Sequence, residues 1–169
     1  ESMVALVTPM DDENKVDMGA LRALLEWHVE CGTRAIVVLG TTGEASTLSS
    51  SERDMVLSET VSVAGGKAAV VAGTGTRDTA ATIETTKRAA ELGADSSLVV
   101  TPYYVKPTQH GLVKHFEAIA SAVDLPLIAY NVPGRTGVAL KPETVGILTE
   151  HPGIVGLKEA TGDNSRVAT

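Results

Sequence analysis

The segment Ala35-Ile36-Val37-Val38-Leu39-Gly40-Thr41-Thr42-Gly43-Glu44 decides the fold class of this chain. Its first five residues form a continuous apolar run, and a turn rich in glycine and threonine follows directly. A strand that is buried on both faces has such an uninterrupted run, because neither of its sides meets water. The segment therefore predicts an interior strand of a parallel sheet, with polar side chains at its carboxyl end.

Similar apolar runs recur along the whole chain at intervals of roughly thirty residues, which suits a repeating βα unit. Besides residues 35–39, they cover residues 4–7, 68–72, 97–100, 127–130 and 154–157. Between them lie segments in which apolar residues follow helical spacing. These predicted helices cover residues 18–29, 51–64, 79–92, 112–123 and 142–149.

Local start and stop signals agree with these predicted helices. Asp17 and Ser49 are suitable N-cap residues, because a short polar side chain can accept a hydrogen bond from a free amide of the first turn. Gly32 and Gly93 follow two helices where a left-handed residue is common. Pro142 suits the first position of another helix.

Polar residues follow most of the predicted strands, and this distribution separates two possible closures of the sheet. A doubly wound open sheet binds its ligand at one switch point, whereas a (β/α)₈ TIM barrel uses the loops after every strand. The polar groups lie at Thr8 and at residues 40–44, 74–77, 101–104, 131–137 and 158–162. The pattern favours the barrel.

The length of the chain accounts for only part of such a barrel. A complete (β/α)₈ barrel needs about 250 residues, and the 169 residues supply about the first six βα units. We therefore expect residues 1–169 to be the N-terminal part of a single barrel domain that lacks its last two βα units. A sixth helix is expected to begin after Asn164 or Ser165.

Composition excludes several classes of protein. The chain has 14 Lys and Arg residues against 21 Asp and Glu residues, and the resulting net charge of −7 opposes binding to nucleic acid. Its apolar runs are too short to cross a membrane. A single cysteine, Cys31, allows no internal disulfide and favours a cytoplasmic location. The four histidines are scattered, so no metal site is expected.

Lys158 is the most informative candidate for catalysis. It follows an apolar strand, and regular alternation from Ile154 places Lys158 on the same face as Ile154 and Gly156. If this face is the barrel interior, desolvation lowers the pKa of the amine and makes it a nucleophile for a ketone. The alternative is a solvated strand-end lysine or one paired with Glu159.

Other strand ends carry groups suited to small-molecule chemistry. Tyr130 can donate and accept a proton, and Arg135 can bind a carboxylate with two hydrogen bonds, although each residue type also serves as scaffold. The turn at residues 40–44 offers hydroxyl and amide groups to a carboxylate or phosphate. Tyr103 and Tyr104 are adjacent in an extended segment, so we expect one to face the site and the other a neighbour.

Six stretches of the chain form an ordered set of motifs, at residues 4–10, 40–44, 72–75, 101–104, 130–137 and 156–162. In this order they resemble the dihydrodipicolinate synthase family, part of the wider superfamily of N-acetylneuraminate lyase and other pyruvate aldolases. Arg135 and the run Lys158-Glu159-Ala160-Thr161-Gly162 resemble the synthase more than its relatives. The resemblance implies a (β/α)₈ barrel and a lyase of lysine and diaminopimelate biosynthesis.

The resemblance also implies roles for named residues. Lys158 would form an imine with pyruvate, and Tyr130 would donate and accept protons. Thr41 and Tyr104 would relay protons between Tyr130 and solvent, with Tyr104 reaching into the site of a neighbouring subunit. Thr42 would bind the carboxylate of pyruvate.

The second substrate implied is L-aspartate 4-semialdehyde, whose carboxylate Arg135 would bind. The family needs no metal or organic cofactor and is generally a homotetramer of tight dimers. Its C-terminal helical region is expected to be absent here. Lysine-sensitive members use a histidine and a glutamate where this chain has Arg53 and Ala81, so we expect weak or absent inhibition by lysine.

Two alternatives stay open at this point. The protein can be another 2-keto-acid aldolase of the same superfamily, because an imine-forming lysine serves both activities. It can also be a catalytically inactive barrel fragment, because units of the barrel are missing. Borohydride trapping with pyruvate distinguishes the inactive fragment, and substrate assays distinguish the two enzymes.

Overall fold

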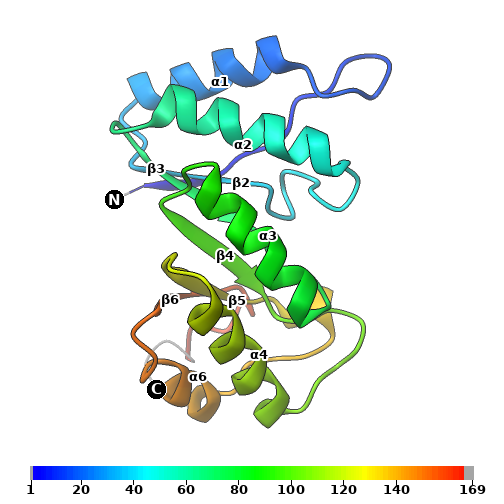
Figure 1. Cartoon of the computed structure of the whole chain (residues 1–169), viewed down its shortest axis with the longest axis vertical. Coiled ribbons are helices and arrows are strands. Elements are labelled where there is room, and N and C mark those ends of the chain that lie inside the picture. Colours follow the sequence, from blue (N-terminus) through cyan, green and yellow to red (C-terminus); the bar gives the residue numbers. More distant parts are fainter. Residues whose placement is uncertain (1, 166–169) are drawn as a thin grey trace. The chain divides into compact units, whose positions relative to one another are not determined.

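The computed structural model describes residues 2–165, which form two compact units (Figure 1). The first unit contains residues 2–73 and 89–96, and the second contains residues 74–88 and 97–165. Helix α3 (Thr79–Glu91) runs from the second unit into the first. No helix within residues 2–165 has the length and apolar character needed to span a membrane.

The first unit is built from three parallel strands that alternate with two helices, as the sequence predicts. Its elements are β1 (Met3–Ala5), α1 (Met18–Glu30), β2 (Ala35–Val38), α2 (Ser50–Ala64) and β3 (Ala69–Gly73). Strand β2 pairs in parallel with β1 and with β3. All four residues of β2 are buried, which confirms the prediction of an interior strand.

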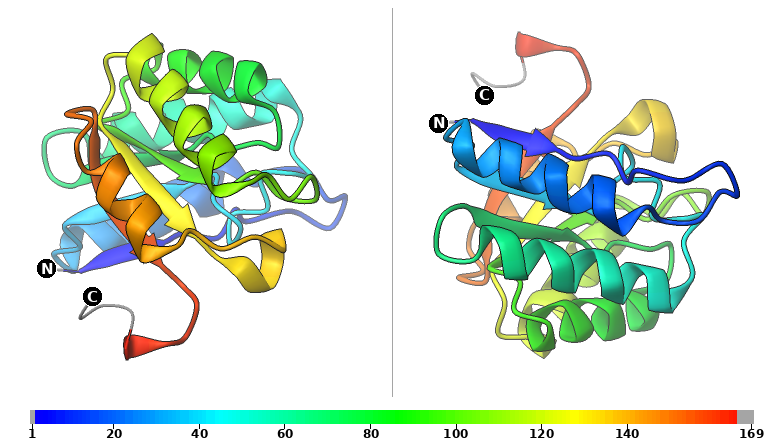
Figure 2. Two further views of the ribbon diagram at one scale, coloured as in Figure 1. Left: turned by 90° about the horizontal axis from the view of Figure 1, so that it is seen from below. Right: turned by 90° about the horizontal axis from the view of Figure 1, so that it is seen from above.

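Helices α1 and α2 lie side by side, as Figure 2 shows most clearly in its right view. Leu21 and Leu25 of α1 are completely buried, and the Arg22 Nε donates to Glu59 Oε1 of α2 at 2.6 Å. The predicted caps are confirmed. Asp17 accepts from the amide of Ala20, and Ser49 forms a reciprocal capping box at the start of α2.

The second unit continues the alternation of strands and helices. Its further elements are β4 (Ser96–Val100), α4 (Gln109–Ala122), β5 (Leu127–Asn131), α5 (Pro133–Thr136), α6 (Pro142–Leu148) and β6 (Ile154–Glu159). Strand β5 pairs in parallel with β4 and with β6. Apolar side chains of these strands pack with α4 and α6 in one core cluster that includes Val99, Phe116, Leu127 and Leu148.

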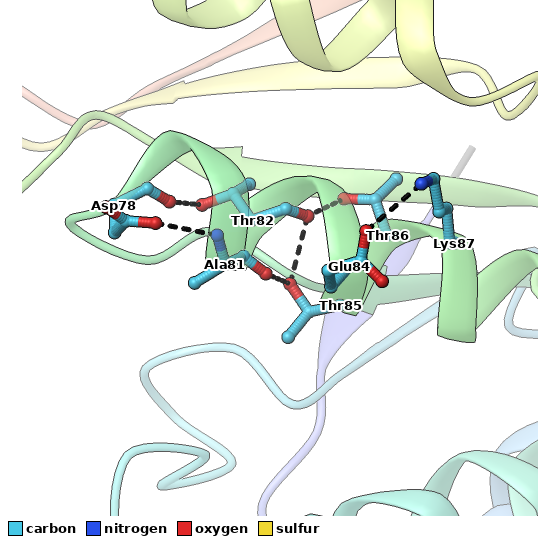
Figure 3. Close-up of polar contacts among 7 residues, drawn as sticks. All are labelled: Asp78, Ala81, Thr82, Glu84, Thr85, Thr86 and Lys87. Atoms are coloured by element: carbon cyan, nitrogen blue, oxygen red, sulfur yellow. Dashed lines mark hydrogen bonds and ion pairs between the residues drawn. The ribbon is translucent and has the colours of Figure 1, made fainter.

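The start of α3 is held by a series of polar contacts (Figure 3). Asp78 Oδ1 accepts from the amide of Ala81 at 2.7 Å, and the hydroxyl of Thr82 donates to the Asp78 carbonyl at 2.8 Å. The hydroxyl of Thr86 donates to the hydroxyl of Thr74 at 2.9 Å. These bonds fasten α3 to the turn that follows β3.

Two helices, α4 and α5, differ from the predictions. Helix α4 begins at Gln109 rather than at residue 112, because Thr108 accepts from the amide of Gly111 and caps the helix there. Residues 133–136 form the short helix α5 at the end of β5, which is not among the helices predicted from the sequence (Figure 2, left). Pro133 suits its first position, and Gly137 ends it at φ +73°. The sixth helix expected after Asn164 or Ser165 lies outside the described residues.

Candidate active site

The register between β5 and β6 changes within the pair, and this change corrects one sequence prediction. Leu127 pairs with Ile154, but the next residue of β5, Ile128, pairs with Gly156. Val155 therefore has no partner on β5, which is the arrangement of a β-bulge. Regular alternation predicts that Lys158 shares a face with Ile154 and Gly156. The register agrees for Gly156, but the prediction for Ile154 is wrong.

Beyond the bulge, Lys158 shares a face with Tyr130 rather than with Ile154. Tyr130 and Lys158 are Cα partners, whereas Ile154 packs with Leu127 and Ala129 in the core beneath the helices. Successive residues of a strand point to opposite faces, so Tyr130 points away from that core. The bulge thus turns Lys158 toward Tyr130 and away from the helices.

Lys158 and Tyr130 are in direct contact at the carboxyl ends of their strands. The Nζ atom of Lys158 lies 4.4 Å from the centroid of the Tyr130 ring. Burial lowers the pKa of the Lys158 amine, because desolvation disfavours its charged form. Tyr130 itself is buried. The pair therefore combines an amine that loses its proton more readily with a phenol that can exchange one.

A polar cluster on the next residues joins the ends of the same two strands. The Nδ2 of Asn131 donates to both carboxylate oxygens of Glu159, at 3.2 and 2.9 Å. Its Oδ1 accepts from the amide of Leu140 at 3.0 Å. Glu159 also accepts from the amide of Thr161 at 2.9 Å. These contacts are not predicted from the sequence, although Asn131 and Glu159 directly follow the predicted site residues Tyr130 and Lys158.

Arg135 and Tyr104 lie on two segments of the second unit that share a buried hydrogen bond. Arg135 is exposed on α5, and the next residue, Thr136, accepts from the hydroxyl of Thr101 at 3.2 Å. Tyr104 is 84% exposed and has a φ of +73°. A left-handed backbone is unfavourable for tyrosine, and such strain is common at functional sites.

Thr41 and Thr42 belong to the first unit, in the turn that follows β2. Both side chains are exposed. The turn is fixed by the buried Thr8, whose hydroxyl donates to the carbonyl of Gly43 at 2.7 Å. A Cβ on Gly43 would lie 3.1 Å from the carbonyl oxygen of Leu6, so the turn fits closely against the chain after β1. The two threonines are thus presented to solvent on a well-supported turn.

The structure therefore brings Lys158 and Tyr130 together and places Arg135 and Tyr104 on linked segments of the same unit. Within residues 2–165, no three His, Cys, Asp or Glu side chains are grouped so that they could hold a metal ion. The reactive groups that these residues offer are the amine of Lys158, the phenol of Tyr130 and the guanidinium group of Arg135.

These features define the class of protein: parallel β/α units whose polar side chains stand at the carboxyl ends of the strands, as in (β/α)₈ barrels. Residues 1–169 match the model of the Dihydrodipicolinate synthetase family. The chain belongs to this family.

Curated relatives and solved structures agree with this assignment. The chain is 53% identical over 99% of its length to a 4-hydroxy-tetrahydrodipicolinate synthase from Methylococcus capsulatus and 56% identical over 98% to one from Alcanivorax borkumensis. It spans 57% and 56% of the length of these relatives.

Among solved structures, the chain is similar to a chloride-inhibited dihydrodipicolinate synthase from Acinetobacter baumannii complexed with pyruvate. The TM-score is 0.96 at 56% identity, over 98% of this chain and 57% of that one. A synthase from Cyanidioschyzon merolae with lysine bound gives a TM-score of 0.94 at 44% identity, over 99% of this chain and 57% of that one. The fold is thus that of about the first six βα units of a (β/α)₈ barrel, as predicted from the sequence.

Proposed function

We propose that the protein containing this chain is a Schiff-base lyase that condenses pyruvate with L-aspartate 4-semialdehyde to give 4-hydroxy-tetrahydrodipicolinate. The observation that carries the proposal is the Lys158 amine, with its lowered pKa, 4.4 Å from the ring centroid of Tyr130. The names of its relatives and the pyruvate in the Acinetobacter baumannii structure support the same substrate class.

The first half of the proposed reaction forms a covalent intermediate on Lys158. The uncharged Nζ attacks the ketone carbon of pyruvate, and the adduct loses water to become an iminium ion. The iminium group withdraws electrons, so the methyl carbon of pyruvate releases a proton and an enamine forms. Tyr130 is the proton donor and acceptor for these transfers, because its ring lies against the amine.

The second half joins the two substrates and releases the enzyme. The enamine carbon attacks the aldehyde carbon of the semialdehyde, and the aldehyde oxygen takes up a proton. The amino group of the second substrate then attacks the imine carbon and expels Lys158, which closes the ring. No metal or organic cofactor takes part, since the imine on Lys158 supplies the electron sink.

The remaining candidate residues bind the carboxylates and relay protons. Thr42 binds the carboxylate of pyruvate through hydrogen bonds, and Arg135 binds the carboxylate of the semialdehyde with its planar guanidinium group. Thr41 and Tyr104 pass protons between Tyr130 and solvent. The high exposure of Tyr104 supports its role as a residue that reaches into a neighbouring subunit of a cytoplasmic homo-oligomer, a dimer of dimers.

Reductive trapping tests the imine directly. The protein as its gene encodes it is incubated with pyruvate and borohydride, and peptide mass spectrometry locates the reduced adduct. We expect the adduct on Lys158 and none in Lys158→Arg, whose guanidinium group stays charged. Lys141→Arg, a change at an exposed lysine, is the matched control and should retain the adduct. A wild-type protein without an adduct on Lys158 would refute the proposal.

The choice of the second substrate needs a separate assay, because another 2-keto-acid aldolase would also trap pyruvate. We expect condensation with L-aspartate 4-semialdehyde and no cleavage of sialic or sugar acids. Arg135→Ala should raise KM for the semialdehyde more than KM for pyruvate, because its guanidinium binds the second carboxylate. Cleavage of a sugar acid at a comparable rate would favour the aldolase.

A further inference from the structure

The bulge at Val155 makes the register of β6 decisive for the position of Lys158. Ile154 packs in the core with Leu127, and Lys158 is four residues further along the strand. In a regular strand, side chains four residues apart point to the same face, so without the bulge Lys158 would lie on the face of Ile154. A slip of one residue after Ile154 would therefore separate the amine from Tyr130.

Strand β6 has a contact that holds its register just beyond Lys158. Asn131 is completely buried, and its amide donates to both carboxylate oxygens of Glu159, its own partner residue across the two strands. The carbonyl of Asn131 also accepts from the amide of Ala160 at 2.9 Å. A slip by one residue would break these bonds and leave a buried amide without its acceptor, which is costly.

The same amide also fixes the segment that carries Arg135. Asn131 Oδ1 accepts from the amide of Leu140, which lies beyond α5 and is itself completely buried. One side chain therefore holds both β6 and the chain that returns after Arg135. Such doubly bonded buried groups specify a single arrangement more strongly than isolated contacts do.

We propose that Asn131 and Glu159 are positioning residues for Lys158: their contact holds β6 in the bulged register that keeps the amine against Tyr130. Neither residue takes part in the chemistry. The expected effect of this contact on catalysis rests on the proposed function. Its effect on the register of β6 is independent of that function.

A charge-matched exchange tests the contact. Asn131→Asp places two carboxylates opposite each other at pH 8, where they repel, while its remaining oxygen still accepts from Leu140. Adding Glu159→Gln restores a hydrogen bond in the opposite direction, because the new amide at position 159 can donate to the new carboxylate at position 131. We expect Asn131→Asp to slow pyruvate trapping by about 10- to 100-fold and the double variant to recover most of that loss. Asn164→Asp, the same substitution at an exposed position, should leave the rate of pyruvate trapping unchanged.

A second measurement reads the register without any catalysis. In a Cys31→Ser background, Tyr130→Cys combined with Lys158→Cys is expected to form a cross-link on oxidation, because these residues are partners on one face. Tyr130→Cys combined with Leu157→Cys should form none. Asn131→Asp should reduce the first cross-link, and Glu159→Gln should restore it.

The outcomes separate the two proposals. If the wild type traps no pyruvate, the proposed function fails, and the cross-links alone decide the register. Unchanged trapping and cross-linking in Asn131→Asp would overturn the inference. A double variant that recovers neither readout would overturn it too, because complementary groups at 131 and 159 would then be insufficient to hold the strand.

Discussion

Lys158 and Tyr130 are opposed partners on adjacent parallel strands, and the amine nitrogen of the first lies 4.4 Å from the ring centroid of the second. The ring face attracts a positive charge, whereas burial disfavours it and lowers the pKa of the amine. The ring and the hydroxyl of Tyr130 can therefore be tested separately, since the ring contacts the amine and the hydroxyl is the group proposed to exchange protons.

Tyr130→Phe separates these effects. The variant keeps the ring beneath Lys158 and loses only the hydroxyl, so the imine with pyruvate should still be trapped. Turnover should fall by about 100- to 10,000-fold, the usual contribution of a positioned proton donor. Steady-state kinetics and borohydride trapping on the same preparation measure both quantities. Turnover within about threefold of the wild type would contradict a proton-transfer role for Tyr130.

His115 makes stability depend on pH. The side chain is 5% exposed, and its Nδ1 lies 2.9 Å from the hydroxyl of Thr79. Its Nε2 has no hydrogen-bond partner among residues 2–165. Burial lowers the pKa of His115 from 6.5 to about 4, although the charge of Asp78 acts in the opposite direction. The native state therefore favours the neutral imidazole.

Below pH 6.5 the unfolded chain binds a proton at His115 that the native chain does not bind. Stability should thus fall as the pH drops from about 6.5 to about 4, by about 3 kcal/mol in total from this residue. Urea unfolding at several pH values measures the slope. His115→Phe should flatten it, and His110→Gln, an exposed histidine of the same helix, should not. Equal slopes in the wild type and His115→Phe would contradict this assignment.

Local chemistry made much of the fold predictable. Asp17, Ser49 and Pro142 mark helix starts through bonds or backbone restrictions that involve only neighbouring residues. Gly32 and Gly93 have positive φ values, as expected for residues that follow helices. Lys158 and Tyr130 were identified because polar residues at the ends of apolar strands are visible in the sequence.

The bulge was not predicted, because it depends on how β6 pairs with β5. The run of residues 154–157, Ile-Val-Gly-Leu, contains no polar residue that would mark an irregular position. The glycine is the one signal that was available, since a glycine inside a strand is common beside a bulge. The contact between Asn131 and Glu159 depends on the same pairing. This contact is not evident from the sequence because its two residues are 28 positions apart, although each directly follows a predicted site residue.

Gly73 should tolerate no side chain. A Cβ there would lie 2.1 Å from the carbonyl oxygen of Leu39, and backbone atoms cannot move aside as a flexible side chain can. Gly73→Ala should cost at least about 3 kcal/mol of unfolding free energy. Gly146→Ala, inside α6 with no atom within 4 Å of the new Cβ, should instead stabilise by up to about 1 kcal/mol. Urea unfolding of both variants checks the contrast, and similar values would contradict it.

Arg53 and Ala81 should make the protein insensitive to lysine. The Arg53 Nε donates to the carbonyl of Leu48 at 3.2 Å, and Ala81 is exposed with no carboxylate to receive the ammonium group of lysine. Lysine should therefore inhibit the condensation weakly or not at all. Ala81→Glu should lower the inhibitory concentration of lysine by at least about tenfold, or ~1.4 kcal/mol, whereas Ala80→Glu should not. Inhibition of the unmodified protein by micromolar lysine would show that other residues bind it.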